Sequence, residues 1–430
     1  MAFVDVTVVP MDRERTIPHS TVLVQGDRIL IVGPTTEVKV PSRAARVDGK
    51  GKFLIPGLAE MHAHIPGGQA ADSVVERTLY LYVAGGVTTI RGMLGHPRHL
   101  ELRSRAAHSE LVSPTIYTSG PSLNGNSVPT VQSALTMVAE QKAAGYDFLK
   151  IHPGIRREVF DSLSAAARRA GMRMAGHVPL EVGLDRALEV PYATIDHLDG
   201  YVEAMVARGA PVKATESQLF GLNLGEHLDT TRLRSLVQRT REAGVWNVPT
   251  QTLMDNLSPS SSLDALTQRP EMRYVPRATQ SEWAEAKRTI LTETGSTRAS
   301  AGRTMEARRR LIRALHAGGA GLLLGSDAPQ IYNVPGFSIH RELESLVAAG
   351  LTPYQALETG TRNVAVFFGT SVQTGTIEVG KRADLVLLDG NPLTDIRNTG
   401  RQSGVMLRGR WLARAEIQTR LDAIATSAGS

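Results

Sequence analysis

The chain of 430 residues contains no cysteine. Disulfide bonds, thiolate nucleophiles, cysteine zinc sites and iron–sulfur clusters are therefore excluded. Any bound metal ion would have to be held by histidine nitrogen, carboxylate or another oxygen donor. The twelve histidines of the chain are the first candidates for that role.

Long apolar segments are also missing. No hydrophobic run approaches the roughly 18 residues that a transmembrane helix needs, so we expect no membrane association. The first residues run directly into a strand-like pattern without a basic and then apolar leader, so we expect no targeting signal. A cytoplasmic protein is the default expectation, and a secreted or periplasmic protein with a trimmed leader is the alternative.

Aromatic residues and lysines are scarce. Aromatics make up 5% of the chain, and the net charge of +6 comes from 40 Arg and 8 Lys against 42 acidic residues. A nucleic-acid surface combines clustered basic residues with aromatics, so we expect no nucleic-acid partner. The densest basic run, Arg308 to Arg310 with Arg313, lies in a polar helical stretch and is predicted to be an exposed helix face.

The two ends of the chain share a β-rich pattern. Short apolar strands separated by glycine turns are predicted near the N-terminus at 4–8, 21–24 and 29–32, and near the C-terminus at 375–377, 383–388 and 405–407. Two strand-rich ends around a different middle indicate one small β-sandwich domain formed by residues 1–56 and 373–430.

The middle of the chain, residues 57–372, alternates short apolar strands with amphipathic helices such as 159–170 and 308–316. Eight strands are predicted at 53–61, 87–93, 115–119, 148–152, 173–177, 193–197, 245–249 and 321–326. Eight βα units over about 310 residues predict an α/β fold, a (β/α)8 TIM-like barrel. An open doubly wound sheet is the alternative, but the glycine-rich phosphate loop typical of that fold is missing.

Polar residues follow several of the predicted strands at the C-terminal end, where such barrels carry their catalytic groups. These strand-end residues are His62, His64, Lys150, His177, His197 and Asp327. His62 and His64 stand two residues apart on one strand, so their side chains share a face. Each residue alone has a structural explanation; Asp327, for example, could be a helix N-cap. Their coincidence at one end of the strands predicts a metal site.

Lysine is the odd member of this set, because an ammonium group would repel a metal ion. Imidazole and carboxylate suit Zn, Mn, Co or Fe(II). Lys150 lies in an apolar strand end, where burial would lower its pKa and favour the neutral amine. A neutral amine can add carbon dioxide to form a carbamate, whose two oxygens could bridge two ions. Because the chain has only eight lysines, the position of one of them in an apolar strand end favours a role in the site.

The motifs that contain these residues resemble the amidohydrolase superfamily, in its imidazolonepropionase-related and prolidase-like branch, which includes Xaa-Pro and Xaa-basic dipeptidases and ochratoxin hydrolases. The resemblance spans nearly the whole chain. The matching motifs are Pro56-Gly57-Leu58 through His62-Ala63-His64, Gly86-Val87-Thr88-Thr89, Phe148-Leu149-Lys150-Ile151, Gly176-His177, Ile195-Asp196-His197, Gly325-Ser326-Asp327-Ala328, Ala349-Gly350-Leu351-Thr352-Pro353, Thr361-Arg362-Asn363 and Gly375-Thr376-Ile377 through Ala383-Asp384-Leu385.

The resemblance implies two divalent ions, with Zn expected and Mn, Co or Fe as alternatives. His62, His64 and Asp327 would hold the buried ion, and His177 and His197 the more exposed one. Carboxylated Lys150 and a hydroxide would bridge both ions. The exposed ion would polarise the scissile carbonyl, while Asp327 would take the hydroxide proton and pass it to the departing amine. Imidazolonepropionases hold one metal and lack this lysine, so Lys150 favours the binuclear, peptidase-like branch.

Further residues are candidates for the substrate side of the site. Tyr201 either donates to the carbonyl oxygen during attack or packs on the barrel rim. His152, two residues beyond Lys150, is either pocket-lining or structural. The other substrate-binding candidates, which follow strands three and eight, are Asn124, Tyr332, His340 and Arg341. His340 and Arg341 could reach a substrate carboxylate or begin a surface helix. The long polar insert at 258–303 is predicted to form helices that act as a lid or an oligomer contact.

These patterns predict an amidohydrolase that cleaves an amide or peptide bond in a dipeptide, an N-acyl amino acid or an amide-linked toxin such as ochratoxin. Two alternatives remain open from the residues. One is an ester, lactone or organophosphate hydrolase that uses the same hydroxide. The other is an inactive barrel that serves as a binding protein. The resemblance also implies a homo-oligomer.

Overall fold

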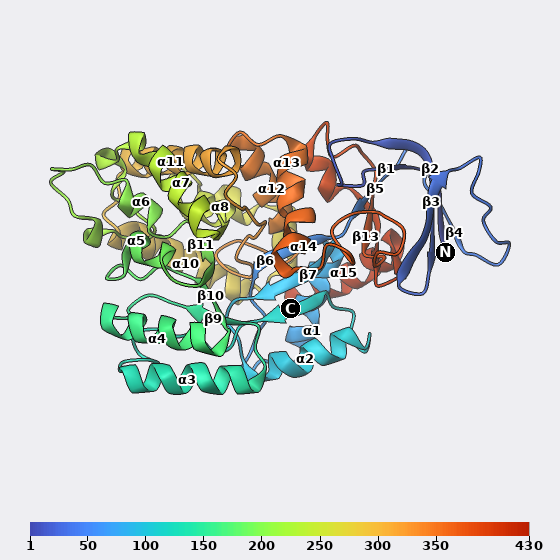
Figure 1. Cartoon of the computed structure of the whole chain (residues 1–430). Helices are drawn as coiled ribbons and strands as arrows, with labels where there is room; N and C mark the ends of the chain where they lie inside the picture. The colour runs from blue at the N-terminus through green and yellow to red at the C-terminus, as the bar shows by residue number, and fades with distance from the viewer. Residues whose placement is uncertain (430) are drawn as a thin grey trace.

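The computed structural model describes residues 1–429, and three sheets form the framework of this part of the chain (Figure 1). The largest is an eight-stranded sheet with the order β15-β14-β13-β5-β1-β2-β3, in which β4 pairs with β1. Its strands are β1 (Ala2–Val8), β2 (Ile17–Gln25), β3 (Arg28–Pro34), β4 (Arg46–Asp48), β5 (Phe53–Pro56), β13 (Leu385–Leu388), β14 (Gln402–Leu407) and β15 (Arg410–Ala413).

Strands from both ends of the chain meet in this sheet through β5 and β13, which pair antiparallel with Leu385 opposite Pro56. The two ends of the chain therefore contribute strands to one sheet. The predicted strand at 375–377 was wrong: Ile377 donates its amide to the carbonyl of Pro10 without forming a strand. A second layer that would make this unit a sandwich stays a prediction.

The middle of the chain builds two parallel sheets. One contains β6 (Leu58–Ala63), β7 (Val87–Gly92) and β8 (Thr115–Thr118); the other contains β9 (Phe148–Ile151), β10 (Arg173–Gly176), β11 (Tyr192–Asp196) and β12 (Trp246–Val248). The predicted strand at 53–61 is divided at Gly57, whose amide donates to the carbonyl of Asp384. Its first half therefore joins the terminal sheet, and its second half begins the parallel one.

The segment 321–326, predicted as the eighth strand, lies between β12 and β6 but makes only isolated pairings. Leu322 bridges Asn247 of β12, and the carbonyl of Leu324 accepts from the amide of Met61 in β6 (2.8 Å). The amide of Leu324 donates instead to the carbonyl of Thr359 (3.0 Å), which interrupts a regular strand ladder. A further isolated bridge joins Ser119, after β8, to the start of β9.

Helices surround the parallel strands, whereas the terminal sheet stands to one side (Figure 1). The helices are α1 (Asp72–Ala84), α2 (Pro97–Ala107), α3 (Val131–Ala144), α4 (Arg157–Ala170), α5 (Gly183–Leu188), α6 (Tyr201–Ala204), α7 (Leu233–Ala243), α8 (Gln251–Leu257), α9 (Leu263–Thr267), α10 (Arg277–Glu293), α11 (Arg298–Ala317), α12 (Ser338–Ala348), α13 (Pro353–Thr359), α14 (Arg362–Phe368) and α15 (Arg414–Gly429). Parallel strands flanked by helices confirm the predicted α/β class.

Helix α4 illustrates why these residues form helices against the strands. Its apolar residues recur at helical spacing, so Val159, Phe160 and Leu163 are buried together on one face. The helix ends at Gly171, whose φ of 62° is the left-handed conformation that favours glycine at a helix end. The periodicity that predicted a helix at 159–170 therefore corresponds to a buried face.

The insert at 258–303 is helical, as predicted, and contains α9, α10 and the first turns of α11. Lys287 of α10 is buried and donates to the carbonyls of Asn256 and Ser258, which fastens the insert to the end of α8. The prediction of an exposed basic face at 308–310 was wrong for Arg308, which is fully buried. Within residues 1–429, no helix has both the length and the apolar character needed to cross a bilayer.

Candidate metal centre

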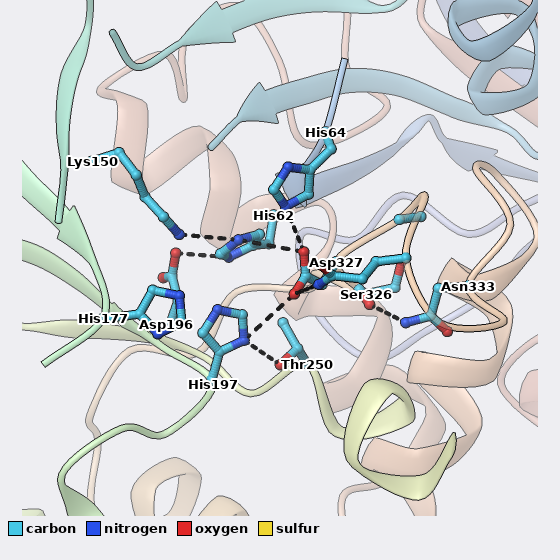
Figure 2. Close-up of polar contacts among 12 residues, drawn as sticks. His62, His64, Lys150, His177, Asp196, His197, Thr250, Ser326, Asp327 and Asn333 are labelled. Carbon is cyan, nitrogen blue, oxygen red and sulfur yellow. Dashed lines mark hydrogen bonds and ion pairs between the residues drawn. The ribbon is translucent and has the colours of Figure 1, made fainter. Parts of the chain in front are cut away.

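Three ligand-type side chains converge beyond the C-terminal end of β6 (Figure 2). His62, His64 and Asp327 each offer one ligand atom within 4.8 Å of the others. The Nε2 atom of His64 lies 2.6 Å from Oδ1 of Asp327, and Nε2 of His62 lies 3.6 Å from the same oxygen. The alternation of β6 places His62 and His64 on one side, as their spacing predicted.

Three further predicted residues lie on the other side of His62. The Nζ atom of Lys150 is 3.2 Å from Nε2 of His62, and the ring of His197 is centred 4.5 Å from that of His62. The ring of His177 in turn lies 4.5 Å from that of His197. The structure therefore brings the six strand-end side chains together in one cluster, as Figure 2 shows.

Three of the imidazoles have Nδ1 in contact with an outer partner, through a hydrogen bond in His177 and His197 and through an ion-pair contact in His62. These pairs are His62 Nδ1 with Asp196 Oδ2 (2.9 Å), His177 Nδ1 with Asp199 Oδ2 (2.7 Å) and His197 Nδ1 with Thr250 Oγ1 (2.9 Å). An outer partner on Nδ1 fixes the tautomer and ring orientation and leaves Nε2 available as a ligand atom. The sequence predicted no role for Asp196 and Asp199, although they flank His197, whereas Thr250 was a candidate to line the mouth of the site.

The charges in the cluster suit a divalent cation. Burial lowers the pKa of His62 and His197 well below the usual range and that of His177 to about 3, so the imidazoles are neutral donors. Burial alone would raise the pKa of Asp327, but His62 and His64 hold it below its ordinary value, so the carboxylate is anionic. Neutral nitrogens around a carboxylate form a donor set that fits Zn or a similar ion.

Lys150 is fully buried within this set. Burial lowers its pKa to about 8, against the opposing effect of the carboxylates of Asp196 and Asp327. A lysine with a pKa near neutrality exists partly as the free amine. Burial of Lys150 therefore favours the neutral amine that carbamate formation requires.

Two buried ionisable residues, Glu60 and Arg91, contact residues that form or flank the cluster. Glu60 accepts from the amides of Ser326 (2.7 Å) and His62 (3.1 Å), and its burial raises its pKa to about 8. Arg91 of β7 places one nitrogen 3.1 Å from both carboxylate oxygens of Asp196. Arg91 therefore orients the carboxylate that lies 2.9 Å from Nδ1 of His62.

The backbone at the strand ends is strained. His197, Leu198, Thr250 and Asp327 have φ values of 62°, 57°, 46° and 67°, in the left-handed region that non-glycine residues seldom adopt. Such conformations persist only where their surroundings hold them, and they concentrate at functional sites. Here the buried Arg308 of α11 donates to the carbonyls of His197 (2.7 Å) and Pro249 (3.0 Å).

His152 also reaches the cluster, because its ring is centred 4.9 Å from that of His177. Burial and then the nearby Lys150 lower its pKa to about 2. Asn124 serves its own loop instead: its side-chain oxygen accepts from the amides of Asn126 and Ser127, both at 2.9 Å. That geometry is an Asx turn, in which the side chain is used locally.

The structure does not bring Tyr201 to the metal centre. Its hydroxyl is bonded to Thr240 Oγ1 of α7 (2.8 Å), and its ring is buried in the apolar layer between strands and helices. The predicted role as oxyanion donor therefore has no geometric support. The reason is that α6 begins at Tyr201 and turns this side chain outward onto α7.

The three candidates after strand eight also lie elsewhere. Tyr332 packs against Trp283 with ring centroids 5.7 Å apart. His340 bonds to Thr399 and to the carbonyl of Gly85, and Arg341 is paired with Glu271 at 2.6 Å. The first turn of α12 therefore faces the terminal sheet and the insert, away from the six-residue cluster.

Two residues near the cluster were missed by sequence reasoning. Gln330 donates to Oδ2 of Asp327 (2.7 Å). Phe220 places its ring 5.3 Å from the ring of His197 and 6.2 Å from that of His177. A lone aromatic before a glycine in a long polar connection was the available signal for Phe220.

A cavity of about 690 Å³ lies beyond His177, between α5 and the connection that follows α6. Its lining includes Val178, Leu180, Glu203 and Val212, but none of the six clustered residues. The cavity therefore borders the candidate metal centre without containing it.

Comparisons with known proteins agree with this fold. A sequence model of the Amidohydrolase family matches residues 53–412. The chain is 25% identical over 391 residues to an imidazolonepropionase from Symbiobacterium thermophilum, covering 86% of this chain and 84% of that protein. Among solved structures, bottromycin amidohydrolase has a TM-score of 0.73 at 23% identity, covering 100% and 90% of the two chains. A Xaa-Pro dipeptidase with bound methionine has a TM-score of 0.69 at 17% identity, covering 96% and 99%.

The chain belongs to the amidohydrolase family, since the family model spans most of its length. It is accordingly a hydrolase that acts on carbon–nitrogen bonds, and its His62, His64 and Asp327 form a group able to hold a metal ion. The resemblance stated from the sequence motifs is confirmed.

Proposed function

We propose that the chain is a binuclear, metal-dependent amidohydrolase that cleaves an amide or peptide bond in a small substrate. The observation that carries this proposal is the convergence of four imidazoles, one carboxylate and one buried lysine at the same end of the parallel strands. A mononuclear site would leave the buried Lys150 without a role.

The residues divide into two ligand groups. His62, His64 and Asp327 would hold the inner ion, which their mutual distances support. His177 and His197 would hold the outer ion through the Nε2 atoms that their partners leave available. In the N6-carboxylated form, Lys150 would contribute one oxygen to each ion. Zn is the metal we propose, with Mn, Co and Fe as alternatives of similar ligand preference.

When bound, such ions supply an activated water and polarise the scissile carbonyl. The side chains of the protein then have separate tasks. Asp327 accepts the proton of the attacking water and returns it to the departing amine, as a carboxylate held anionic at this position can do. Gln330 holds the second oxygen of Asp327, so the other oxygen stays turned toward His64. His152 lies beside His177 and is proposed to contact substrate.

We further propose that residues 57–372 close into a (β/α)8 barrel and that residues 1–56 and 373–430 form a β-sandwich domain beside it. The isolated pairings of 321–328 with β12 and β6, and of Ser119 with β9, support closure. The shared sheet of both chain ends supports the second domain.

The substrate class we propose is a dipeptide or an N-acyl amino acid. The solved structures similar to this chain include a Xaa-Pro dipeptidase, and the centre described above would suit the same kind of bond. The test is a panel of dipeptides and N-acyl amino acids, each paired with its ester isostere, offered to the Zn-loaded and Mn-loaded protein. Turnover of amides supports the proposal. Turnover confined to the esters would contradict it and favour an ester hydrolase.

A further inference from the structure

The connection between α6 and α7, residues 205–232, brings one aromatic side chain to the metal centre. The ring of Phe220 is centred 5.3 Å from that of His197 and 6.2 Å from that of His177, and it lies within 22° of parallel to the latter. Phe220 is only partly buried. An apolar side chain that stays partly exposed therefore lies beside the two histidines proposed to hold the outer ion.

The surroundings of Phe220 are apolar as well. Phe220, Leu219 and Ile331 are partly buried side chains that pack against one apolar cluster beneath them. The cluster consists of Leu222, Leu253, Met254, Leu257, Ala301 and Met305. We refer to Leu219, Phe220 and Ile331 as the apolar wall. By contrast, the neighbours of Asp327 are the polar side chains of His64 and Gln330.

The position of Phe220 is fixed by the fold. Leu219 and Phe220 have φ values of 37° and 57°, and Gly221 follows at 79°. Two non-glycine residues in this region cost free energy that the surrounding contacts must offset. Helix α11 provides such contacts, since Thr304 donates to the carbonyl of Gly221 (2.9 Å) and Ser300 to that of Leu222 (3.0 Å).

We propose that the apolar wall, with Phe220 at its centre, selects substrates that carry a planar or bulky apolar group next to the scissile carbon–nitrogen bond. This inference rests on the proposed function and adds the chemical class of the substrate. A substrate ring against Phe220 would remove apolar surface from water and stack on a ring already in place. A small or polar group there gains neither contribution, so the wall discriminates by size and polarity.

Binding of two phosphonates tests this inference without turnover. Methylphosphonate and phenylphosphonate share a metal-binding head and differ only in the apolar group. We expect the Zn-loaded full chain to bind phenylphosphonate at least tenfold more tightly, as measured by titration calorimetry. A ratio of affinities near one would overturn the inference.

Variants at position 220 assign the preference to the ring. Phe220→Ala should reduce the ratio below threefold, Phe220→Leu should leave an intermediate ratio, and Phe220→Tyr should keep it. Phe368→Ala is the matched control, because Phe368 is a partly buried aromatic of α14 that stacks on Tyr117. The zinc content of every variant shows whether the centre has formed. A Phe220→Leu or Phe220→Ala protein with bound zinc and an unchanged ratio would overturn the role of Phe220.

The outcome also separates the two proposals. Hydrolysis of N-acetyl and N-benzoyl amino acids is measured on the same preparations. Phenyl preference that depends on Phe220 without any amide hydrolysis would uphold the apolar wall and contradict the proposed function. Amide hydrolysis with no phenyl preference would uphold the proposed function and contradict the role of the apolar wall.

Discussion

Lys150 is the residue on which the proposed two-metal site depends most. It is buried, it lies 3.2 Å from His62, and its pKa is lowered to about 8. Its identity as a site residue could be predicted because a lysine in an apolar strand end is rare in a chain with eight lysines. The carbamate proposed for Lys150 depends on burial of the amine, which the whole fold produces and the local sequence does not.

Lys150→Ala should lose most of the bound metal and nearly all amide hydrolysis, because the group proposed to bridge both ions is removed. Metal per chain is measured by elemental analysis after purification without chelator, together with turnover. A Lys150→Ala protein that kept two metals and full turnover would exclude the binuclear assignment. Lys142→Ala is the control, since Lys142 is an exposed lysine of α3.

Asp199 and Asp196 each pair with the Nδ1 atom of a clustered histidine, but of the two only Asp196 also accepts hydrogen bonds from a buried arginine, Arg91. We expect Asp199→Asn to weaken metal binding by about 10- to 100-fold, because it loses the partner that orients His177. Asp196→Asn should weaken metal binding similarly and also lower the free energy of unfolding by about 3–5 kcal/mol, since Arg91 would keep a buried, unpaired charge.

Chelator competition measures the metal affinity of the Asp199→Asn and Asp196→Asn variants, and urea unfolding of their apo forms measures their stability. Equal stability of the two apo variants would contradict the role assigned to Arg91.

Residues at strand ends could be placed from the sequence, whereas residues on helices could not. The six strand-end residues could be found because side chains alternate along a strand and parallel strands present the same ends together. Tyr201, His340 and Arg341 lie on helices, and which face a helix presents depends on its packing. For that reason Tyr201 faces Thr240 and Arg341 faces Glu271, which local sequence could not reveal.

At the scale of elements, α11 does more than cover the strands. It was predicted as an exposed basic helix at 308–310, yet Arg308 reaches inward to the carbonyls of His197 and Pro249. A run of three arginines contains no sign of which one is buried. The strand periodicity was a better guide, although it could not anticipate that Leu324 would donate to Thr359 and interrupt the eighth strand.

Arg308→Met should destabilise the protein by about 2–4 kcal/mol, because it leaves the buried carbonyls of His197 and Pro249 without donors. It should also weaken metal binding, since His197 would lose the support for its left-handed backbone. Arg310→Ala, which removes an exposed arginine paired only with Glu306, should change the stability by less than about 0.5 kcal/mol. Urea unfolding and chelator competition provide the two readouts. Similar behaviour of the two variants would contradict the supporting role of Arg308.

At the scale of the whole molecule, the C-terminal helix joins the terminal sheet to the helical layer. Ile417, Leu421 and Ile424 of α15 pack in one apolar cluster with Tyr80 and Leu81 of α1. The shared sheet of both ends could be predicted because both ends show the same pattern of short apolar strands separated by turns. The docking of α15 could not be predicted, because no motif couples it to α1.

Leu421→Ala should lower the free energy of unfolding by about 2–4 kcal/mol through the cavity it creates, while zinc affinity stays unchanged because the helix contributes nothing to the ligand set. Gln418→Ala, on the exposed face of the same helix, is the control. A loss of zinc affinity in folded Leu421→Ala would contradict the separation of stability from the site.

The central claim is that amide hydrolysis depends on two metal ions held by these six residues. The most direct measurement is the rate of hydrolysis of a responsive N-acyl amino acid or dipeptide as zinc is returned to chelator-treated protein in the presence of bicarbonate. We expect no hydrolysis without metal, and a rate of hydrolysis that rises with added zinc and reaches its plateau at two equivalents per chain. Full activity without metal, or a plateau at one equivalent, would contradict the central claim.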